Sequence, residues 1–275
     1  MSLTALLGLV FGALLAATII GQILRRTHPS ATVSNMNERI VTWWVLCGLT
    51  ALALAVGDIA VVVLFAVFSA LALREYVTVT HSGRFWPYLV FVAVQYGLLW
   101  SRSHGLFVFL LPVSALVVAW RGRFVLYFGV MVCVYFFSYA PAVRSRTLLF
   151  YFLIVVELSD VMQWVWGKLL GRRPVVPRIS PQKTWEGLIG GILTATALGA
   201  ALYRATPFSP VVAAAVCAAV TLAGFAGGLA MSAVKRRYGV KDFGTVLRGH
   251  GGVLDRIDSL CFAAPVFFCL VKYLS

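Results

Sequence analysis

The sequence predicts an all-α, polytopic membrane protein with about ten transmembrane helices. Hydrophobic residues make up 61% of the 275 residues, and charged residues make up only 12%. A soluble domain of this length is roughly half apolar and about a quarter charged. Long apolar segments also recur along the whole chain, and each meets or approaches the roughly 20 residues that a spanning helix needs. Most of the protein surface is therefore expected to face lipid.

The predicted spanning segments are separated by short polar connections. They are residues 3–24, 40–56, 58–76, 86–101, 105–120, 123–141, 146–167, 185–204, 209–231 and 258–274. No basic residue precedes the first segment, which is long enough to span, so we interpret it as a helix and not as a cleaved signal. The count falls to about eight or nine if the segments beside Gly57-Asp58 or around 101–105 are re-entrant.

The basic residues give the predicted orientation. The net charge is +14, and such a charge could indicate nucleic acid, but basic residues of membrane proteins collect in cytoplasmic loops for topological reasons. If the loop after the ninth segment is cytoplasmic, 18 of the 23 Lys and Arg residues fall on the cytoplasmic side. This bias argues against a nucleic-acid partner. It predicts that both termini lie outside and that loops 168–184 and 232–257 share the cytoplasmic face.

Two regions of the chain differ in character. Residues 1–145 consist mainly of apolar segments, and we interpret them as membrane-anchoring helices. Residues 146–275 contain both polar loops, and we predict that they form the catalytic region.

Two acidic residues lie toward the cytoplasmic end of the seventh predicted span. Glu157 and Asp160 are three residues apart, so a helix places them on one face. Carboxylates at membrane depth are costly and usually face a polar cavity or a charged partner. A structural pair with Lys or Arg is the alternative to a functional role.

The segment Ser180-Pro-Gln-Lys-Thr-Trp-Glu-Gly187 leads into a Gly-rich predicted helix. A hydroxyl residue followed by Glu before an apolar run is typical of a helix start. The free N–H groups of a helix start can bind an anion, and Ser180, Lys183 and Thr184 could add donors. An ordinary helix cap beside a cytoplasmic lysine is equally compatible with this pattern.

The stretch from Ser232 to Asp258 is the most polar part of the chain. It holds six of the 23 basic residues and three of the nine acids. Asp255 and Asp258 are three residues apart at the start of the last predicted span, where a helix N-terminus favours negative charge. Carboxylates beside phosphate-binding cations suit Mg²⁺. A solvated basic loop is the alternative interpretation.

Other residues of this stretch favour phosphate binding. Lys235, Arg236, Arg237 and Lys241 are candidate phosphate or headgroup ligands, and glycines surround His250. Zinc is not expected, because His250 has no second His or Cys at ligand spacing. The chain lacks GxxxxGK[ST], which excludes a P-loop.

These residues resemble the integral-membrane CDP-diacylglycerol synthases, also called phosphatidate cytidylyltransferases. The C-terminal family signature is close to S-x-x-K-R-x4-K-D-x-G-x2-L-P-G-H-G-G-x-x-D-R-x-D. The chain matches it at Ser232, Lys235, Arg236, Lys241, Asp242, Gly244, Leu247, Gly249, His250, Gly251, Gly252, Asp255, Arg256 and Asp258. The family segment S-P-K-K-T-x-E-G corresponds to 180–187, and a preceding D-x6-G segment corresponds to Asp160 and Gly167. The resemblance covers roughly residues 150–275.

Two positions depart from the family pattern. Arg248 stands where the family has proline before Gly-His-Gly-Gly, which adds a cation and loosens the turn. Gly228 stands where the family has a metal-binding aspartate in a G-D-L sequence. The missing carboxylate should weaken divalent metal binding, unless Asp242 or Asp160 compensates or this branch has lost or altered the reaction.

The resemblance implies a reaction in which CTP and phosphatidate give CDP-diacylglycerol and pyrophosphate. It implies Mg²⁺ held by Asp255, Asp258 and Asp160, with a second divalent or a monovalent cation left open. The implied catalytic residues are Asp255, His250, Lys241, Asp242 and Arg256. The implied substrate-binding residues are Ser180, Lys183, Thr184, Ser232, Lys235, Arg236, Gly251 and Gly252. The expected location is the bacterial inner membrane with the site facing the cytoplasm, and a homodimer is left open.

Two other functions remain as alternatives. The first is a non-catalytic homologue that binds anionic lipid, which Gly228 favours. The second is a transporter that uses Glu157 and Asp160 as intramembrane charges, which predicts no use for His250.

Overall fold

The computed structural model of the chain describes every residue except 29–30, 104–105, 111, 114–122, 247–250 and 275. The described part is nearly all helical, which confirms the predicted fold class. The longer helices are α1 (Leu3–Thr27), α2 (Ala31–Val56), α3 (Asp58–Val79), α4 (Leu89–Trp100), α8 (Arg146–Leu170), α9 (Trp185–Ala201), α10 (Pro210–Arg237) and α11 (Leu254–Leu274). A further helical rod is formed by α6 (Phe124–Val130), the π-helix Met131–Phe136 and α7 (Phe137–Ala142).

Among the described residues, seven helical segments are long and apolar enough to cross a membrane. The difference from the predicted count lies in three segments. Predicted segment 86–101 forms a short 3-10 turn followed by the 12-residue helix α4, and 185–204 forms the 17-residue helix α9. Most of predicted segment 105–120 lies outside the described residues.

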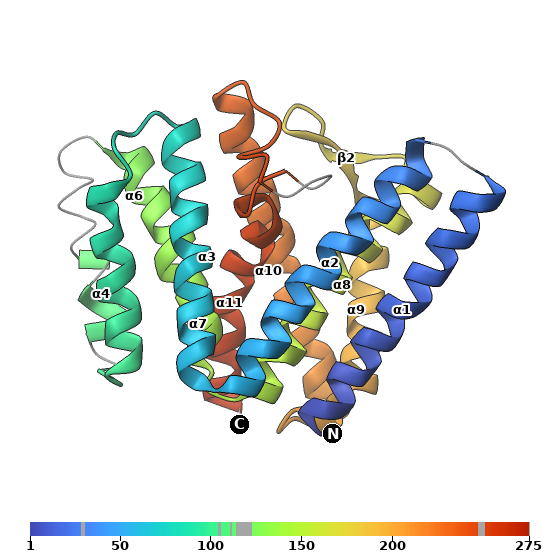
Figure 1. Cartoon of the computed structure of the whole chain (residues 1–275), viewed down its shortest axis with the longest axis horizontal. Helices are drawn as coiled ribbons and strands as arrows, with labels where there is room; N and C mark the ends of the chain where they lie inside the picture. Colours follow the sequence, from blue (N-terminus) through green and yellow to red (C-terminus); the bar gives the residue numbers. More distant parts are fainter. Residues whose placement is uncertain (29–30, 104–105, 111, 114–122, 247–250, 275) are drawn as a thin grey trace.

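Both ends of the chain lie at the same end of the helical assembly, as Figure 1 shows. The segment between α8 and α9 and the segment between α10 and α11 lie at the opposite end (Figure 1). A direct bond ties the first of these segments to the end of α10, because Arg236 Nε donates to the carbonyl of Ile179 at 3.2 Å. The two polar regions singled out in the sequence therefore meet on one face of the protein.

Regular elements extend further into both polar segments than predicted. Helix α10 continues to Arg237 and α11 begins at Leu254, so the connection between them is only 238–253. Cations in the last turn of α10 interact favourably with the negative end of the helix dipole, which allows the helix to continue past the apolar run. Within predicted loop 168–184, residues 168–170 belong to α8, and β1 (Pro174–Val176) pairs antiparallel with β2 (Ser180–Thr184).

The hairpin is tied to the start of α9. Trp185 N donates to the carbonyl of Arg173 at 3.0 Å. The carboxylate of Glu186 accepts from the backbone N–H groups of Arg172 and Arg173 at 3.1 and 3.2 Å. The Thr184 hydroxyl caps α9 by accepting from Gly187 N at 3.1 Å, which confirms the predicted helix start.

Glycines let α9 pack closely on α8. A methyl group at Gly191 would meet the side chain of Gln163 and lie 3.2 Å from its backbone nitrogen. A methyl group at Gly190 would enter the ring of Trp166. Small residues at such interfaces allow close helix approach in a membrane.

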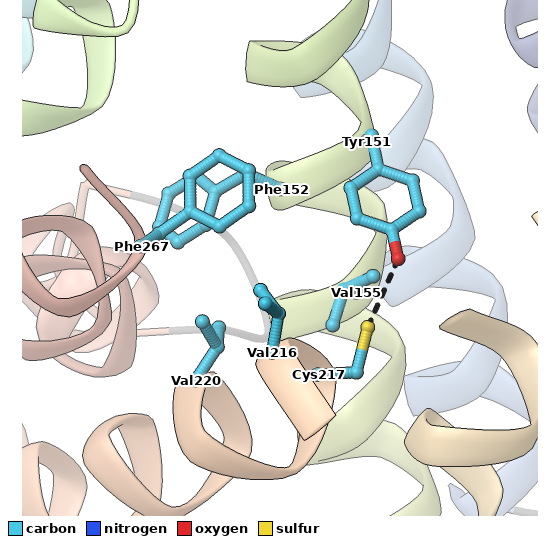
Figure 2. A pocket seen from close by; sticks show the side chains of 7 residues that line it. All are labelled: Tyr151, Phe152, Val155, Val216, Cys217, Val220 and Phe267. Carbon is cyan, nitrogen blue, oxygen red and sulfur yellow. Dashed lines mark hydrogen bonds between the residues drawn. The ribbon is translucent and has the colours of Figure 1, made fainter. Parts of the chain in front are cut away.

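A small apolar pocket lies among α8, α10 and α11. Figure 2 shows that aromatic and aliphatic side chains line it, including Tyr151, Phe152 and Phe267. The Tyr151 hydroxyl lies 3.1 Å from the sulfur of Cys217. The pocket has no room for a water molecule, so it is a packing feature of the core and not a ligand site.

Candidate functional site

Asp255 is the centre of the hydrogen-bond network at the polar end of the protein. It lies in the first turn of α11, and its side chain is only 3% exposed. One carboxylate oxygen forms a 2.8 Å ion pair with Lys235 Nζ at the end of α10. The other accepts from the backbone N–H groups of Phe243 and Gly252 at 2.7 and 2.9 Å. Asp255 therefore joins α10, the connecting segment and α11.

The connecting segment passes very close to this carboxylate. Gly251 has φ +79°, a left-handed backbone conformation that residues with a side chain rarely adopt. A Cβ at this position would also lie 2.9 Å from an oxygen of Asp255 and 3.1 Å from Cβ of Asp242. Gly251 therefore serves the backbone turn beside Asp255, and it brings the exposed Asp242 to the edge of the network.

Glu75 is a site residue that sequence reasoning missed. It lies in α3, and its two carboxylate oxygens accept from the backbone N–H groups of Val253 and Leu254 at 2.9 and 2.8 Å. These donors belong to the start of α11, which has no earlier helical turn to accept them. A carboxylate inside a predicted span was the available signal, because such residues usually have a specific partner.

Lys183 joins the hairpin to the membrane helices. It lies in β2, and its ammonium is 3.5 Å from the carbonyl of Phe225 and 4.9 Å from the centre of that residue's ring. Asp258 of α11 and Asp160 of α8 are its acidic neighbours. Burial lowers the pKa of Lys183, and the negative charges of both aspartates act in the opposite direction. One cation of the site thus interacts electrostatically with two carboxylates, and the three groups come from three separate elements.

Gly228 faces this cation. A Cβ at position 228 would run into the ammonium of Lys183 and lie 3.6 Å from the Ser259 hydroxyl oxygen. The position where the resemblance leads us to expect a carboxylate is therefore next to Lys183. Because Gly228 has no side chain, the Lys183 ammonium can occupy the space beside it.

Several predicted substrate-binding residues have partners within the protein. Besides its bond to Ile179, Arg236 donates from Nη1 to the carbonyl of Val240 at 3.1 Å. Ser232 donates to the carbonyl of Gly228 at 2.6 Å, and Thr184 caps α9. The Arg236 bond to Ile179 joins α10 to the hairpin and the Thr184 cap joins β2 to α9, whereas the Ser232 bond lies within α10.

The remaining predicted residues differ in their surroundings. Lys241 and Asp242 are exposed, and Ser180 is partly buried in β2, where it pairs with Val176. Within the described part of the chain, the buried Nε of Arg256 has no hydrogen-bond partner. His250 lies outside the described residues.

The predicted metal ligands do not all have free oxygens. Asp255 has three protein donors on its carboxylate. Asp258 Oδ1 accepts from the backbone N–H of Ser259 at 2.8 Å and lies 3.4 Å from the Ser259 hydroxyl oxygen. In the described ranges, no three His, Cys, Asp or Glu side chains are placed to hold a metal ion. The donor set therefore fits Mg²⁺ only as two carboxylates completed by substrate phosphates.

Comparisons with known proteins agree on one family. The chain matches the model of the "Cytidylyltransferase family" over residues 37–274. It is 34% identical to "Uncharacterized protein YnbB" of Escherichia coli (strain K12) over 97% of each chain. It is 39% identical to a phosphatidate cytidylyltransferase of Bacillus subtilis (strain 168), over 47% of this chain and 49% of that one. It is 34% identical to a phosphatidate cytidylyltransferase of Aquifex aeolicus (strain VF5), over 55% and 56% of the two chains. The match thus spans about half the length of these two enzymes.

Proposed function

Because this chain belongs to the cytidylyltransferase family, we propose that it is a phosphatidate cytidylyltransferase that transfers CMP from CTP to phosphatidate. One observation supports the proposal most directly. Lys183 of β2 faces Gly228 of α10, and its charge interacts electrostatically with those of Asp258 of α11 and Asp160 of α8. Three separate elements, α8, β2 and α11, thus contribute one cation and two carboxylates, which is the chemistry that phosphoryl transfer uses.

In the proposed reaction, a phosphate oxygen of phosphatidate attacks the α-phosphorus of CTP. A new bond forms between that oxygen and the α-phosphorus, the bond to the β-phosphate oxygen breaks, and pyrophosphate leaves. Such transfer depends mainly on positioning and on neutralising the phosphate charge. Lys183 and Arg256 are the cations best placed for this role, because Lys183 adjoins the carboxylates and Arg256 has a buried Nε without a partner among the described residues.

Lys235 has a different role in this proposal. Its ammonium is engaged with Asp255 at 2.8 Å and lies 5.4 Å from the centre of the Phe243 ring. It therefore fixes Asp255 and the connecting segment, and the exposed Lys241 provides a cation at the edge of the site. His250 stays a predicted site residue between Gly249 and Gly251.

We propose Mg²⁺ as the cofactor, held by Asp160 and Asp258 together with the phosphates of CTP. When bound, the ion would neutralise charge on the transferring phosphate. Asp255 orders the start of α11 and so places Asp258. A second cation stays a prediction, as does a homodimer.

We propose that the site faces the cytoplasm of a bacterial inner membrane. The polar end of the protein carries the hairpin with Arg172, Arg173 and Arg178 and the basic end of α10. Cytoplasmic loops are enriched in such residues. Phosphatidate would enter from the membrane between helices, and CTP would enter from the aqueous side.

The test is release of pyrophosphate by the purified protein supplied with CTP and phosphatidate in detergent micelles. We expect pyrophosphate and CDP-diacylglycerol in equal amounts, no product without phosphatidate, and loss of turnover with a chelator that added Mg²⁺ reverses. No turnover with any divalent metal would reject the enzyme and favour the non-catalytic lipid-binding homologue. Gly228 is the observation that favours this second candidate.

A further inference from the structure

We propose that Glu75 is a positioning residue of this site, and that it acts from α3 by holding the first residues of α11 in place. The proposal rests on the proposed function for its kinetic consequences, but its structural part stands independently. Glu75 is 8% exposed and lies 178 residues before Val253, to which it is hydrogen-bonded. It therefore connects the predicted anchoring region to the predicted catalytic region.

The first argument is the direction of the two bonds. Helix starts leave backbone N–H groups without partners inside the helix, and a nearby side chain usually accepts them. The N–H groups of Val253, just before α11, and of Leu254, its first residue, each donate to a separate oxygen of Glu75, at 2.9 and 2.8 Å. A carboxylate in this place also interacts favourably with the positive end of the helix dipole.

The second argument is the close packing around the carboxylate. A Cβ at Gly244 would lie 2.6 Å from Oε1 of Glu75, and a Cβ at Gly252 would meet both of its oxygens. The two glycines come from either side of residues 247–250 and both contact one side chain of α3. This arrangement leaves the Glu75 carboxylate very little freedom to move.

The third argument is the continuity between Glu75 and Asp255. Three successive backbone N–H groups donate to carboxylates, because Gly252 donates to Asp255 while Val253 and Leu254 donate to Glu75. Phe243 N donates to the same oxygen of Asp255, and the Phe243 ring stacks on Tyr76, the neighbour of Glu75, at 6.0 Å. A shift of Glu75 would therefore move the backbone that sets Asp255.

The experiment compares wild type with Glu75→Gln in the pyrophosphate assay and in hydrogen exchange of residues 251–258. Glutamine keeps one acceptor but turns an NH₂ group toward the second N–H donor. We expect faster amide exchange in this segment and a fall in kcat of about 100-fold, the size of loss that a small misplacement causes. KM for CTP should change much less. Glu75→Asp keeps the carboxylate and should recover part of the lost kcat.

The matched control is Ser69→Ala. Ser69 also lies buried on α3, six residues before Glu75, and its hydroxyl is 2.7 Å from the hydroxyl of Tyr96 on α4. Losing this bond should leave kcat and the exchange of 251–258 unchanged. If Ser69→Ala lowers kcat as much as Glu75→Gln does, α3 acts only through general stability and the proposal is overturned.

Two further outcomes keep the test decisive. If Glu75→Gln does not fold, Gly252→Ala takes its place, because its methyl group would push on the same carboxylate from the segment just before α11. Unchanged kcat and exchange in a folded Glu75→Gln or Gly252→Ala protein would overturn the proposal. If wild type shows no CMP transfer, the proposed function fails, and the exchange measurement alone decides whether Glu75 holds the start of α11.

Discussion

The ammonium of Lys183 occupies the space beside Gly228 into which any side chain at position 228 would have to project. Lys183 comes from the hairpin and Gly228 from the interior of α10. The missing side chain at 228 leaves room for the Lys183 ammonium, whose charge interacts electrostatically with those of Asp258 and Asp160. The departure from the family pattern at 228 therefore has a structural consequence within the site.

The first prediction concerns this pair. Gly228→Ala should displace the Lys183 ammonium and lower kcat/KM for CTP about tenfold, and Lys183→Ala should lower it about 100-fold, as expected for hydrogen bonds to charged groups. The double variant should be no worse than Lys183→Ala, because both changes act on one ammonium. Steady-state pyrophosphate assays of the three variants measure this coupling, and additive losses would contradict it.

The second prediction compares two ion pairs of equal length. Lys235–Asp255 and Arg146–Asp58 both measure 2.8 Å, but the Asp255 side chain is 3% exposed and that of Asp58 is 65% exposed. Asp255→Asn should destabilise the protein by about 3–5 kcal/mol, because it leaves a buried charge unpaired, and should abolish turnover. Asp58→Asn should cost less than about 1 kcal/mol and leave turnover intact. Denaturation in detergent measures the stability of the two variants, and the pyrophosphate assay measures their turnover. Equal losses of stability and turnover in the two variants would contradict the prediction.

The third prediction concerns the base of the hairpin. Glu186→Ala removes the acceptor for the N–H groups of Arg172 and Arg173, so the segment before β1 should open more often. Trypsin should then cleave after Arg172 about tenfold faster, the effect of losing roughly 1.5 kcal/mol of hydrogen bonding. Mass spectrometry of timed digests in detergent measures this. Glu38→Gln on the exposed face of α2 is the control and should leave the rate unchanged.

The fourth prediction compares two helical glycines. A methyl group at Gly191 would strike Gln163 of α8, whereas a methyl group at Gly48 of α2 would have no atom within 4 Å. Gly191→Ala should therefore destabilise the protein by about 1–3 kcal/mol through overpacking. Gly48→Ala should be neutral or stabilising by up to about 1 kcal/mol, because alanine favours helix. Thermal unfolding of both variants measures the difference in stability. An equal shift of Tm in the two variants would contradict the prediction, because the α8–α9 interface would then accommodate the extra methyl group.

The candidate site was only partly predictable. The spacing of Asp255 and Asp258 correctly predicts acids at the start of α11, and Thr184 caps α9 as its position before Glu186 indicates. The same patterns do not show that Lys235 pairs with Asp255, because a charge in a sequence carries no information about its partner. The patterns also do not reveal that Ser232 and Arg236, predicted as substrate ligands, donate to backbone carbonyls of the protein.

Composition and the lengths of apolar runs determine that this is a membrane protein, in which order its helices follow and which face is polar. These properties depend on how favourably each stretch of side chains transfers from water to lipid, which the local sequence alone decides. The packing of α3 against α11 decides the rest. It brings the Glu75 carboxylate to the N–H groups of Val253 and Leu254, while close approach of β2 and α10 brings Lys183 to Gly228. These contacts join residues far apart in the chain, and they form only when buried polar groups find partners as the helices pack.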